Sequence, residues 1–254
     1  MIRLIVSGAA GKMGREVIKA IAQQEDMQVV AGVDPTLDVI DQIKVYTDLA
    51  QAIRETKPHV VIDFTHPGVV KQNIEVCLAH NIRMVVGTTG LAAQELEELQ
   101  MRVKDRDWAA LIVPNFAIGA VLMMRFAAEA AQFFPNMEII EYHHEQKKDA
   151  PSGTAIKTAE MISQVLKNSP DQQDNDSYEK IMGSRGGQLG NVQIHSVRLP
   201  GYVAHQEVIC GLSGQSLTIR HDSTDRVCFM PGVVLAVEKI HSLRGVIYGL
   251  ENIL

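Results

Sequence analysis

Short apolar runs alternate with amphipathic stretches over the first half of the sequence. The apolar runs contain few polar residues and cover 2–6, 27–33, 59–64, 83–86 and 109–114. Apolar residues at helical spacing predict helices over 13–24, 48–55, 68–80 and 92–105. Strands without polar alternation, separated by helices, are typical of a parallel sheet covered on both faces. We therefore expect an α/β fold with a Rossmann-like, doubly wound parallel sheet.

The second half follows a different pattern. Helices are expected over 118–134 and 154–167, with a strand over 137–144 between them, and the polar, glycine-rich segment 168–190 is expected to form a loop. Consecutive strands without intervening helices then predict a second, α+β domain with a mixed sheet; they cover 192–199, 204–211 and 216–222. A last helix over 231–243 and an apolar tail are expected to return to the first domain. The first domain would thus comprise 1–129 and 226–254, and the second 130–225.

A glycine-rich turn lies between the first predicted strand and the first predicted helix. Its glycines, Gly8, Gly11 and Gly14, follow the spacing G-x-x-G-x-x-G, one residue longer than the usual dinucleotide motif. Such a turn lets the backbone approach a pyrophosphate at the N-terminus of the helix, although the same spacing also occurs in turns that bind nothing. Asp34, at the end of the second strand, is placed to accept hydrogen bonds from the adenosine ribose.

The same aspartate bears on the choice between NAD and NADP. A carboxylate beside the ribose repels a 2′-phosphate and favours NAD, whereas Lys12 in the glycine turn can offset that repulsion. We expect NAD to be preferred and NADP to be tolerated. Two further segments, Gly87–Gly90 and Pro114–Phe116, also follow predicted strands. Because ligands bind beyond the carboxyl ends of parallel strands, we expect both segments to lie at the cofactor edge.

The segment 141–155 combines proton donors with groups that can hold an anion. Two adjacent histidines, His143 and His144, and a lysine, Lys147, leave the end of a predicted strand, and Ser-Gly-Thr then opens a helix. Histidine titrates near neutral pH, lysine donates a proton or fixes an anion, and the N-terminus of a helix can bind a carboxylate. Adjacent histidines on a strand point to opposite faces, so we expect no metal site. The alternative is that this segment is a solvated polar loop without a binding or catalytic role.

The pattern E-x-H-H-x-x-K-x-D-A-P-S-G-T-A resembles the signature of the 4-hydroxy-tetrahydrodipicolinate reductase family. The motifs G-x-x-G-x-M-G, VGTTG and PNFAIG occur in the order that this family has. The resemblance implies a Rossmann-like domain completed by the C-terminal helix, and a substrate domain whose mixed sheet builds a homotetramer. It also implies reduction of (2S,4S)-4-hydroxy-2,3,4,5-tetrahydrodipicolinate to tetrahydrodipicolinate and water by NADH or NADPH, in the diaminopimelate and lysine pathway.

The resemblance also implies roles for individual residues. His143 resembles the acid/base residue and Lys147 the proton donor, while His144, Gly153 and Thr154 resemble contacts to the substrate carboxylates. The implied cofactor contacts are Gly8, Ala9, Ala10, Gly11, Lys12, Met13, Asp34, Gly87, Thr88, Thr89, Val113, Pro114, Asn115 and Phe116. Glu145 and Gln146 depart from the basic residues often found at their positions, which predicts a less cationic rim around the substrate.

Composition and charge exclude other classes of protein. The formal net charge is −6 and no cluster of Lys and Arg stands out, which argues against a nucleic-acid partner. The N-terminal sequence lacks the apolar core of a signal peptide, and no apolar run is long enough to span a membrane. We therefore expect a cytoplasmic enzyme that acts on a small dicarboxylate without a metal. The alternatives are another NAD(P)-dependent dehydrogenase, such as an aspartate dehydrogenase, and a dinucleotide sensor that performs no catalysis.

Overall fold

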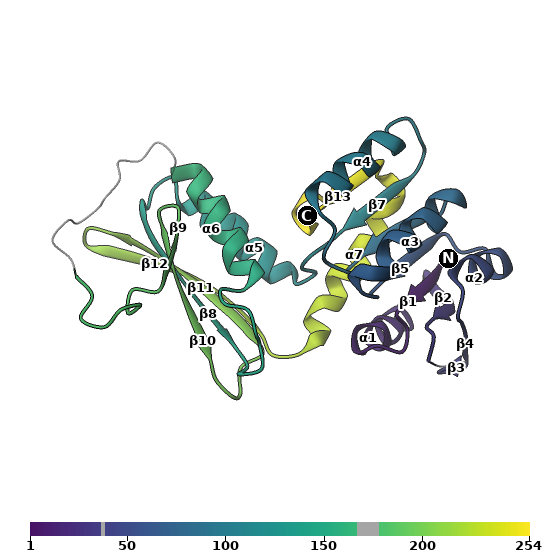
Figure 1. Ribbon diagram of the computed structural model, residues 1–254, viewed down its shortest axis with the longest axis horizontal. Helices are drawn as coiled ribbons and strands as arrows, with labels where there is room; N and C mark the ends of the chain where they lie inside the picture. The colour runs from purple at the N-terminus through teal and green to yellow at the C-terminus, as the bar shows by residue number, and fades with distance from the viewer. Residues whose placement is uncertain (37–38, 167–177) are drawn as a thin grey trace. The chain divides into compact units, whose positions relative to one another are not determined.

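The computed structural model describes residues 1–36, 39–166 and 178–254, which form two compact units (Figure 1). The first unit contains Met1–Ile118 and Arg226–Leu254, and the second contains Gly119–Asp225. The first boundary lies at residue 118 instead of 129, because helix α5 (Ile118–Ala130) groups with the second unit. Within the described residues, no helix is both long and apolar enough to cross a membrane.

The first unit is built on an eight-stranded sheet with the order β13-β7-β6-β5-β1-β2-β4-β3. Every pair of neighbours is parallel except β3 and β4. The strands are β1 (Ile2–Ser7), β2 (Met27–Val33), β3 (Val39–Ile40), β4 (Ile43–Tyr46), β5 (Val60–Asp63), β6 (Arg83–Val86), β7 (Ala109–Ile112) and β13 (Gly245–Tyr248). The chain passes from β1 to β2 on one side and later to β5 on the other side. The prediction of a doubly wound, Rossmann-like sheet is confirmed, and the point where the strand order reverses lies between β1 and β5.

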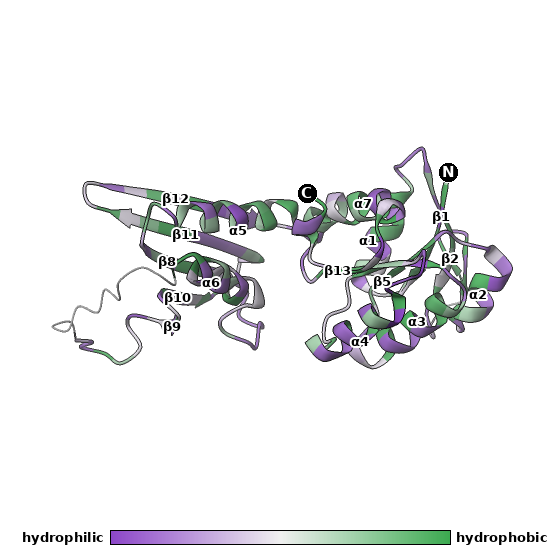
Figure 2. Cartoon of the chain, turned by 90° about the horizontal axis from the view of Figure 1, so that it is seen from above, coloured by the Kyte–Doolittle hydropathy of each residue, from purple (hydrophilic) through white to green (hydrophobic). Residues whose placement is uncertain are grey.

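Helices cover both faces of this sheet (Figure 2). Helices α1 and α7 lie on one face, and α2, α3 and α4 lie on the other. Their bounds are α1 (Lys12–Ile21), α2 (Leu49–Thr56), α3 (Pro67–Ala79), α4 (Ala93–Val103) and α7 (Met230–Lys239). Helix α2 begins where the Asp48 carboxylate accepts hydrogen bonds from the N–H groups of Ala50 and Gln51, at 3.0 and 3.2 Å. The central strands are fully buried, which explains why they lack polar alternation.

The second unit contains a five-stranded mixed sheet with the order β12-β11-β8-β10-β9. Strands β8 (Asn136–His143) and β10 (Val192–Arg198) are parallel, and the other neighbours are antiparallel. The remaining strands are β9 (Gly187–Leu189), β11 (Ala204–Leu212) and β12 (Gln215–Ser223). Helix α6 (Gly153–Leu166) packs against β8, β9 and β10. The predicted α+β domain with a mixed sheet is confirmed.

One face of this second sheet is covered by helices. Gln206 on β11 donates to the Thr158 hydroxyl of α6 at 2.8 Å, and its cross-strand partner His221 lies against Gly119 of α5. Side chains alternate between faces along a strand, so their neighbours in sequence point to the opposite face. On β8 the helix-covered positions Met137, Ile139 and Glu141 are buried, whereas the positions between them are partly exposed. No helix of the described residues covers the opposite side, which we call the open face.

Four strands were not predicted. Strands β3 and β9 have only two and three residues. They are defined by their pairing with neighbouring strands and contain no apolar run that the sequence could show. Strand β9 lies inside the segment expected to be a loop, of which residues 168–177 lie outside the described residues. Strand β4 also lacked a clear apolar pattern. The apolar tail forms β13, which pairs with β7.

The hairpin between β3 and β4 offers a test of backbone strain. Its two turn residues, Asp41 and Gln42, have φ angles of 47° and 68°, in the left-handed region that side chains disfavour by roughly 1–2 kcal/mol. We predict that Gln42→Gly stabilises the chain by about 0.5 kcal/mol, because relief of strain exceeds the entropy that glycine adds to the unfolded chain. The urea midpoint should rise for Gln42→Gly but not for Gln42→Ala. A lower midpoint for the glycine variant would contradict this reading of the turn.

Candidate active site

The glycine turn lies at the carboxyl end of β1 and is shaped by close backbone contacts. Gly8 has a φ of +80°, and a Cβ atom there would lie 2.4 Å from the Phe64 carbonyl oxygen. A Cβ atom on Gly14 would lie 2.2 Å from the Gly8 carbonyl oxygen, so α1 packs against the turn only with glycine at that position. Gly11 is the N-cap of α1, and no side chain caps this end of the helix. The turn therefore leaves the N-terminus of α1 to bind an anion.

Asp34 is held beside this turn at the end of β2. One carboxylate oxygen accepts a hydrogen bond from the Ala10 N–H at 3.0 Å. The other accepts from the N–H and hydroxyl of Thr36 at 3.0 and 2.6 Å. The side chain is only 9% exposed, so its position is fixed by contacts with the glycine turn itself. The structure thus brings together the two parts of the predicted adenosine site.

A second aspartate, Asp63, was not anticipated from the sequence. It ends β5, is fully buried, and accepts hydrogen bonds from Asn73 and from the Thr88 hydroxyl, each at 2.7 Å. Its oxygen Oδ1 also accepts from the N–H and hydroxyl of Thr65. Asp63 therefore fixes the loop after β6 relative to the loop after β5. The available signal was a carboxylate at the end of the apolar run His-Val-Val-Ile-Asp.

Each predicted cofactor residue lies at the carboxyl edge of the first sheet. Residues 8–13 follow β1, Asp34 follows β2, residues 87–89 follow β6, and residues 113–116 follow β7. Their side chains are not equally accessible: Lys12, Thr89 and Pro114 are exposed, while Thr88 and Val113 are buried. The Phe116 side chain is also buried, 5.5 Å from the ring centroid of Phe64. Phe116 and Val113 are therefore buried parts of this edge, whereas Lys12, Thr89 and Pro114 are accessible from solvent.

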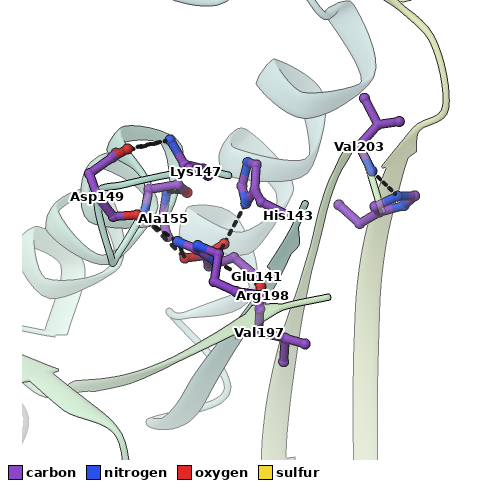
Figure 3. Close-up of polar contacts among 10 residues, drawn as sticks. Glu141, His143, Lys147, Asp149, Ala155, Val197, Arg198 and Val203 are labelled. Atoms are coloured by element: carbon purple, nitrogen blue, oxygen red, sulfur yellow. Dashed lines mark hydrogen bonds and ion pairs between the residues drawn. The ribbon is translucent and has the colours of Figure 1, made fainter. Parts of the chain in front are cut away.

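In the second unit, His143 is the last residue of β8, and its ring is bound to a buried carboxylate (Figure 3). Its Nδ1 atom lies 2.5 Å from Oε2 of Glu141, whose side chain is fully buried. Arg198, at the end of β10, donates two hydrogen bonds to the same carboxylate, at 2.8 and 2.9 Å. Burial alone would raise the pKa of Glu141, but hydrogen bonds from His143, Arg198 and Ser196 lower it to about 2. Glu141 is therefore ionised at neutral pH.

The loop after β8 carries Lys147 and is fastened to the same cluster. The Lys147 ammonium group donates to both carboxylate oxygens of Asp149, at 2.8 and 2.9 Å, and lowers the pKa of Asp149. The Asp149 carbonyl oxygen accepts a hydrogen bond from Arg198 at 2.7 Å. A cis peptide bond joins Ala150 and Pro151. The Lys147 ammonium is thus linked to the β8–β10 strand ends through Asp149.

The N-terminus of α6 follows directly. Ser152 is buried, and its hydroxyl accepts a hydrogen bond from the Ala155 N–H at 3.2 Å, while its own N–H donates to Glu141 at 3.2 Å. A Cβ atom on Gly153 would meet nothing within 4 Å, so space is open in front of this helix end. Thr154 is partly exposed and His144 exposed. Gly153 and Thr154 therefore lie at a helix N-terminus, where an anion is favoured, while His144 directly follows β8.

Arg198 is the residue of this cluster whose role the sequence left undecided. Sequence alone did not tell whether Arg198, Arg220 and Arg226 contact an anion or an interface. In the structure Arg198 is opposite His143 in the register of β10 and β8 and binds Glu141. Arg220 lies on the open face and pairs with Glu207 and Asp222.

Within the described residues, no group of three or more His, Cys, Asp or Glu side chains is arranged to hold a metal ion.

Comparison with known proteins assigns the family. Residues 2–116 match the family described as "Dihydrodipicolinate reductase, N-terminus", and residues 119–254 match "Dihydrodipicolinate reductase, C-terminus". A 4-hydroxy-tetrahydrodipicolinate reductase from Listeria innocua is 49% identical to this chain. The alignment covers 100% of both sequences. The enzyme of the same name from Syntrophomonas wolfei is 50% identical, with 99% of this chain and 98% of the relative covered.

Solved structures agree with this assignment. A dipicolinate-bound dihydrodipicolinate reductase from Paenisporosarcina sp. TG-14 superposes with a TM-score of 0.93 at 42% identity, covering 100% of both chains. A probable dehydrogenase from Thermotoga maritima is only 12% identical, with a TM-score of 0.66 over 99% of this chain and 92% of the other, and shares the fold alone. With both halves matched and full-length relatives about half identical, the chain belongs to the dihydrodipicolinate reductase family.

Proposed function

We propose that this chain reduces (2S,4S)-4-hydroxy-2,3,4,5-tetrahydrodipicolinate to tetrahydrodipicolinate and water, with NADH or NADPH, in the cytoplasmic diaminopimelate and lysine pathway. The observation that carries the proposal is the full-length match to reductases of that name. The His143–Glu141 pair, the Lys147 loop and the N-terminus of α6 supply the acid/base groups and the anion site that this reaction needs. Dipicolinate, bound by the relative from Paenisporosarcina, is a ring dicarboxylate of the same kind as the substrate.

The carboxyl edge of the first sheet fits a dinucleotide. The uncapped N-terminus of α1 would bind the pyrophosphate, and Gly8, which has no room for a side chain, allows close approach of the backbone. Asp34 would accept hydrogen bonds from the ribose hydroxyl groups. When bound, the reduced nicotinamide supplies the hydride. The buried Asp63 cluster keeps Thr88 and the neighbouring loop in place beside that site.

The second unit supplies proton transfer and binding of the substrate. The substrate carboxylates would lie at the N-terminus of α6, bound by the N–H groups and hydroxyl of Gly153 and Thr154 and by the exposed His144. Loss of the 4-hydroxyl as water leaves a conjugated cyclic imine, and the hydride adds to C4 of that system. Negative charge then develops toward the ring nitrogen, and Lys147 would neutralise it by giving a proton. Asp149 holds the Lys147 ammonium group in place through two hydrogen bonds. His143 would orient or relay the proton.

The preference between cofactors follows from Asp34. Its carboxylate, fixed by Ala10 and Thr36, would lie where the 2′-phosphate of NADPH must go, and like charges repel. Lys12 is exposed at the start of α1 and offsets part of that repulsion. We therefore expect NADH to be preferred and NADPH to be accepted.

The open face of the second sheet is the surface through which the chain forms a homotetramer. It carries partly exposed apolar side chains, Ile140, Val197 and Ile209, between charged groups that are already paired. Arg220 pairs with Glu207 at 3.2 Å and with Asp222 at 3.0 Å. Paired charges around an apolar strip can be buried against another copy at lower cost than free charges.

The reaction can be followed directly. We predict that the freshly formed aldol product of pyruvate and aspartate semialdehyde causes NADH absorbance to fall in the presence of the protein. The kcat/KM should be higher with NADH than with NADPH because of Asp34, and Lys12→Ala should reduce turnover with NADPH more than turnover with NADH. Binding of the cofactor without any decay of absorbance would identify a dinucleotide sensor instead. A large preference for NADPH would contradict the role given to Asp34.

The role of Lys147 is tested against its neighbour in sequence. Lys147→Ala should lower kcat roughly 10²–10⁴-fold, the range for loss of a general acid, while NADH binding stays unchanged. Lys148→Ala is the matched control, because Lys148 is an exposed lysine on the same loop. Steady-state kinetics of both variants decide the matter. A Lys147→Ala enzyme that retains most of its turnover would remove this lysine from proton transfer.

The homotetramer is tested by measuring molar mass with light scattering on a sizing column. The wild-type protein should have four times the chain mass of 27.9 kDa, and Ile140→Glu should shift it to smaller species. Val39→Glu is the control, since Val39 is an exposed apolar residue on β3 of the first unit. A monomeric wild-type protein, or a tetramer unaffected by Ile140→Glu, would show that the open face does not form the interface.

A further inference from the structure

The fully buried carboxylate of Glu141 is not itself assigned a step in the function described above. His143 nevertheless binds it directly, and Lys147 is linked to it through Asp149 and Arg198. It receives hydrogen bonds from β8 itself, from β10 and from the loop before α6. A carboxylate removed from water is costly unless several donors satisfy it. A buried carboxylate that accepts a hydrogen bond from a catalytic histidine orients the ring and fixes its tautomer.

The hydrogen bond between Glu141 and His143 can have only one direction. Arg198 binds both oxygens of Glu141 through two N–H groups, an arrangement that requires an ionised carboxylate. An ionised carboxylate only accepts hydrogen bonds, so the proton between Oε2 and Nδ1 belongs to the imidazole ring. The low pKa of Glu141 agrees with this conclusion.

The consequence for His143 is a fixed tautomer. With Nδ1 protonated and directed at the buried Glu141, the nitrogen on the other side of the ring, Nε2, is left for the substrate (Figure 3). Neutral His143 then accepts a proton at Nε2, and protonated His143 donates one from the same atom. We propose that Glu141 is a positioning residue, which fixes the proton of His143 on Nδ1 and thereby makes Nε2 the atom that exchanges protons with the substrate.

Arg198 connects Glu141 to Lys147 as well, through Asp149. Its guanidinium group joins the Glu141 carboxylate to the Asp149 carbonyl oxygen, and the Asp149 side chain holds the Lys147 ammonium. A displacement of Arg198 would therefore change the position of Lys147 as well as that of His143. The inference rests on the proposed reductase activity for its catalytic meaning, but the tautomer of His143 can be measured without substrate.

The chain offers a matched control on the same strand. Glu138 also lies on β8 and binds an arginine and a histidine, Arg185 and His195, with His195 Nε2 at 2.8 Å. Glu138 and Glu141 occupy opposite faces of the sheet, because they are three residues apart on one strand. Glu138→Gln thus removes the same charge from the same strand without touching His143.

The test is ¹⁵N NMR of the histidine rings in the full chain, with His143→Gln used to assign the His143 signals. In the neutral ring, the wild-type protein should carry its proton on Nδ1, the reverse of the tautomer that free histidine prefers in water. Glu141→Gln should lose this exclusive preference and lower kcat about 10²-fold, the scale of a misplaced acid/base group. Glu138→Gln should leave the His143 signals as in the wild type.

Two results would overturn the inference: a wild-type neutral ring protonated on Nε2, or a Glu141→Gln protein with unchanged tautomer and kcat. If Glu141→Gln does not fold, the wild-type spectrum alone decides between the two tautomers. Failure of the proposed function looks different. A wild-type protein without NADH oxidation but with the Nδ1 proton would refute the activity while supporting the placement of His143, whereas an active enzyme with the Nε2 proton would refute only the positioning role.

Discussion

The buried ion pair between Glu141 and Arg198 is the contact on which the candidate active site depends. Neither charge could lie inside the second unit alone, because the cost of removing an ion from water amounts to several kcal/mol. Together they join β8 to β10, and further hydrogen bonds of the pair reach His143, Ser152 and the Asp149 backbone. One pair thus fixes the end of a strand, a loop and the start of a helix. That arrangement turns a polar segment into a set of groups with defined positions.

In the first unit, neutral donors satisfy the buried carboxylates. Asp63 is as deeply buried as Glu141, but hydroxyl, amide and backbone N–H groups satisfy it instead of a guanidinium group. Asp34 is likewise fixed by backbone and hydroxyl donors. Carboxylates without a cation leave the carboxyl edge of the sheet less positive, apart from the N-terminus of α1. The negative phosphates of a dinucleotide would therefore be bound mainly by backbone N–H groups and the helix dipole.

The sequence predicted the parts of the fold that depend on local pattern. Fully apolar runs identified the central strands, and the glycine spacing located the turn after β1. Strands β3 and β9 exist only through pairing with β4 and β10, which no local pattern reveals. The boundary at residue 118 was missed because α5 is apolar on most of its surface and could belong to either unit.

The same limit applied to the site. His143, Lys147 and Thr154 are close in sequence, so their motif was visible. Arg198 is 57 residues from Glu141, and only the parallel register of β8 and β10 brings them together. Glu141 belongs to the same motif, but the sequence assigned it no role. Its contacts with Arg198 and Ser152 could not be predicted from the spacing of the motif. Asp63 was hidden in the same way, since its partners Asn73 and Thr88 come from a helix and from another strand end.

The most direct measurement of this account is a crystal structure of the protein with dipicolinate and NADH bound. We expect a ligand carboxylate at the N-terminus of α6, against Gly153 and Thr154, with Nε2 of His143 facing the ring. Arg198 should remain on Glu141, because its partner is the buried carboxylate and not the ligand. A structure in which Arg198 has left Glu141 to bind dipicolinate, or in which dipicolinate binds away from α6, would contradict the account.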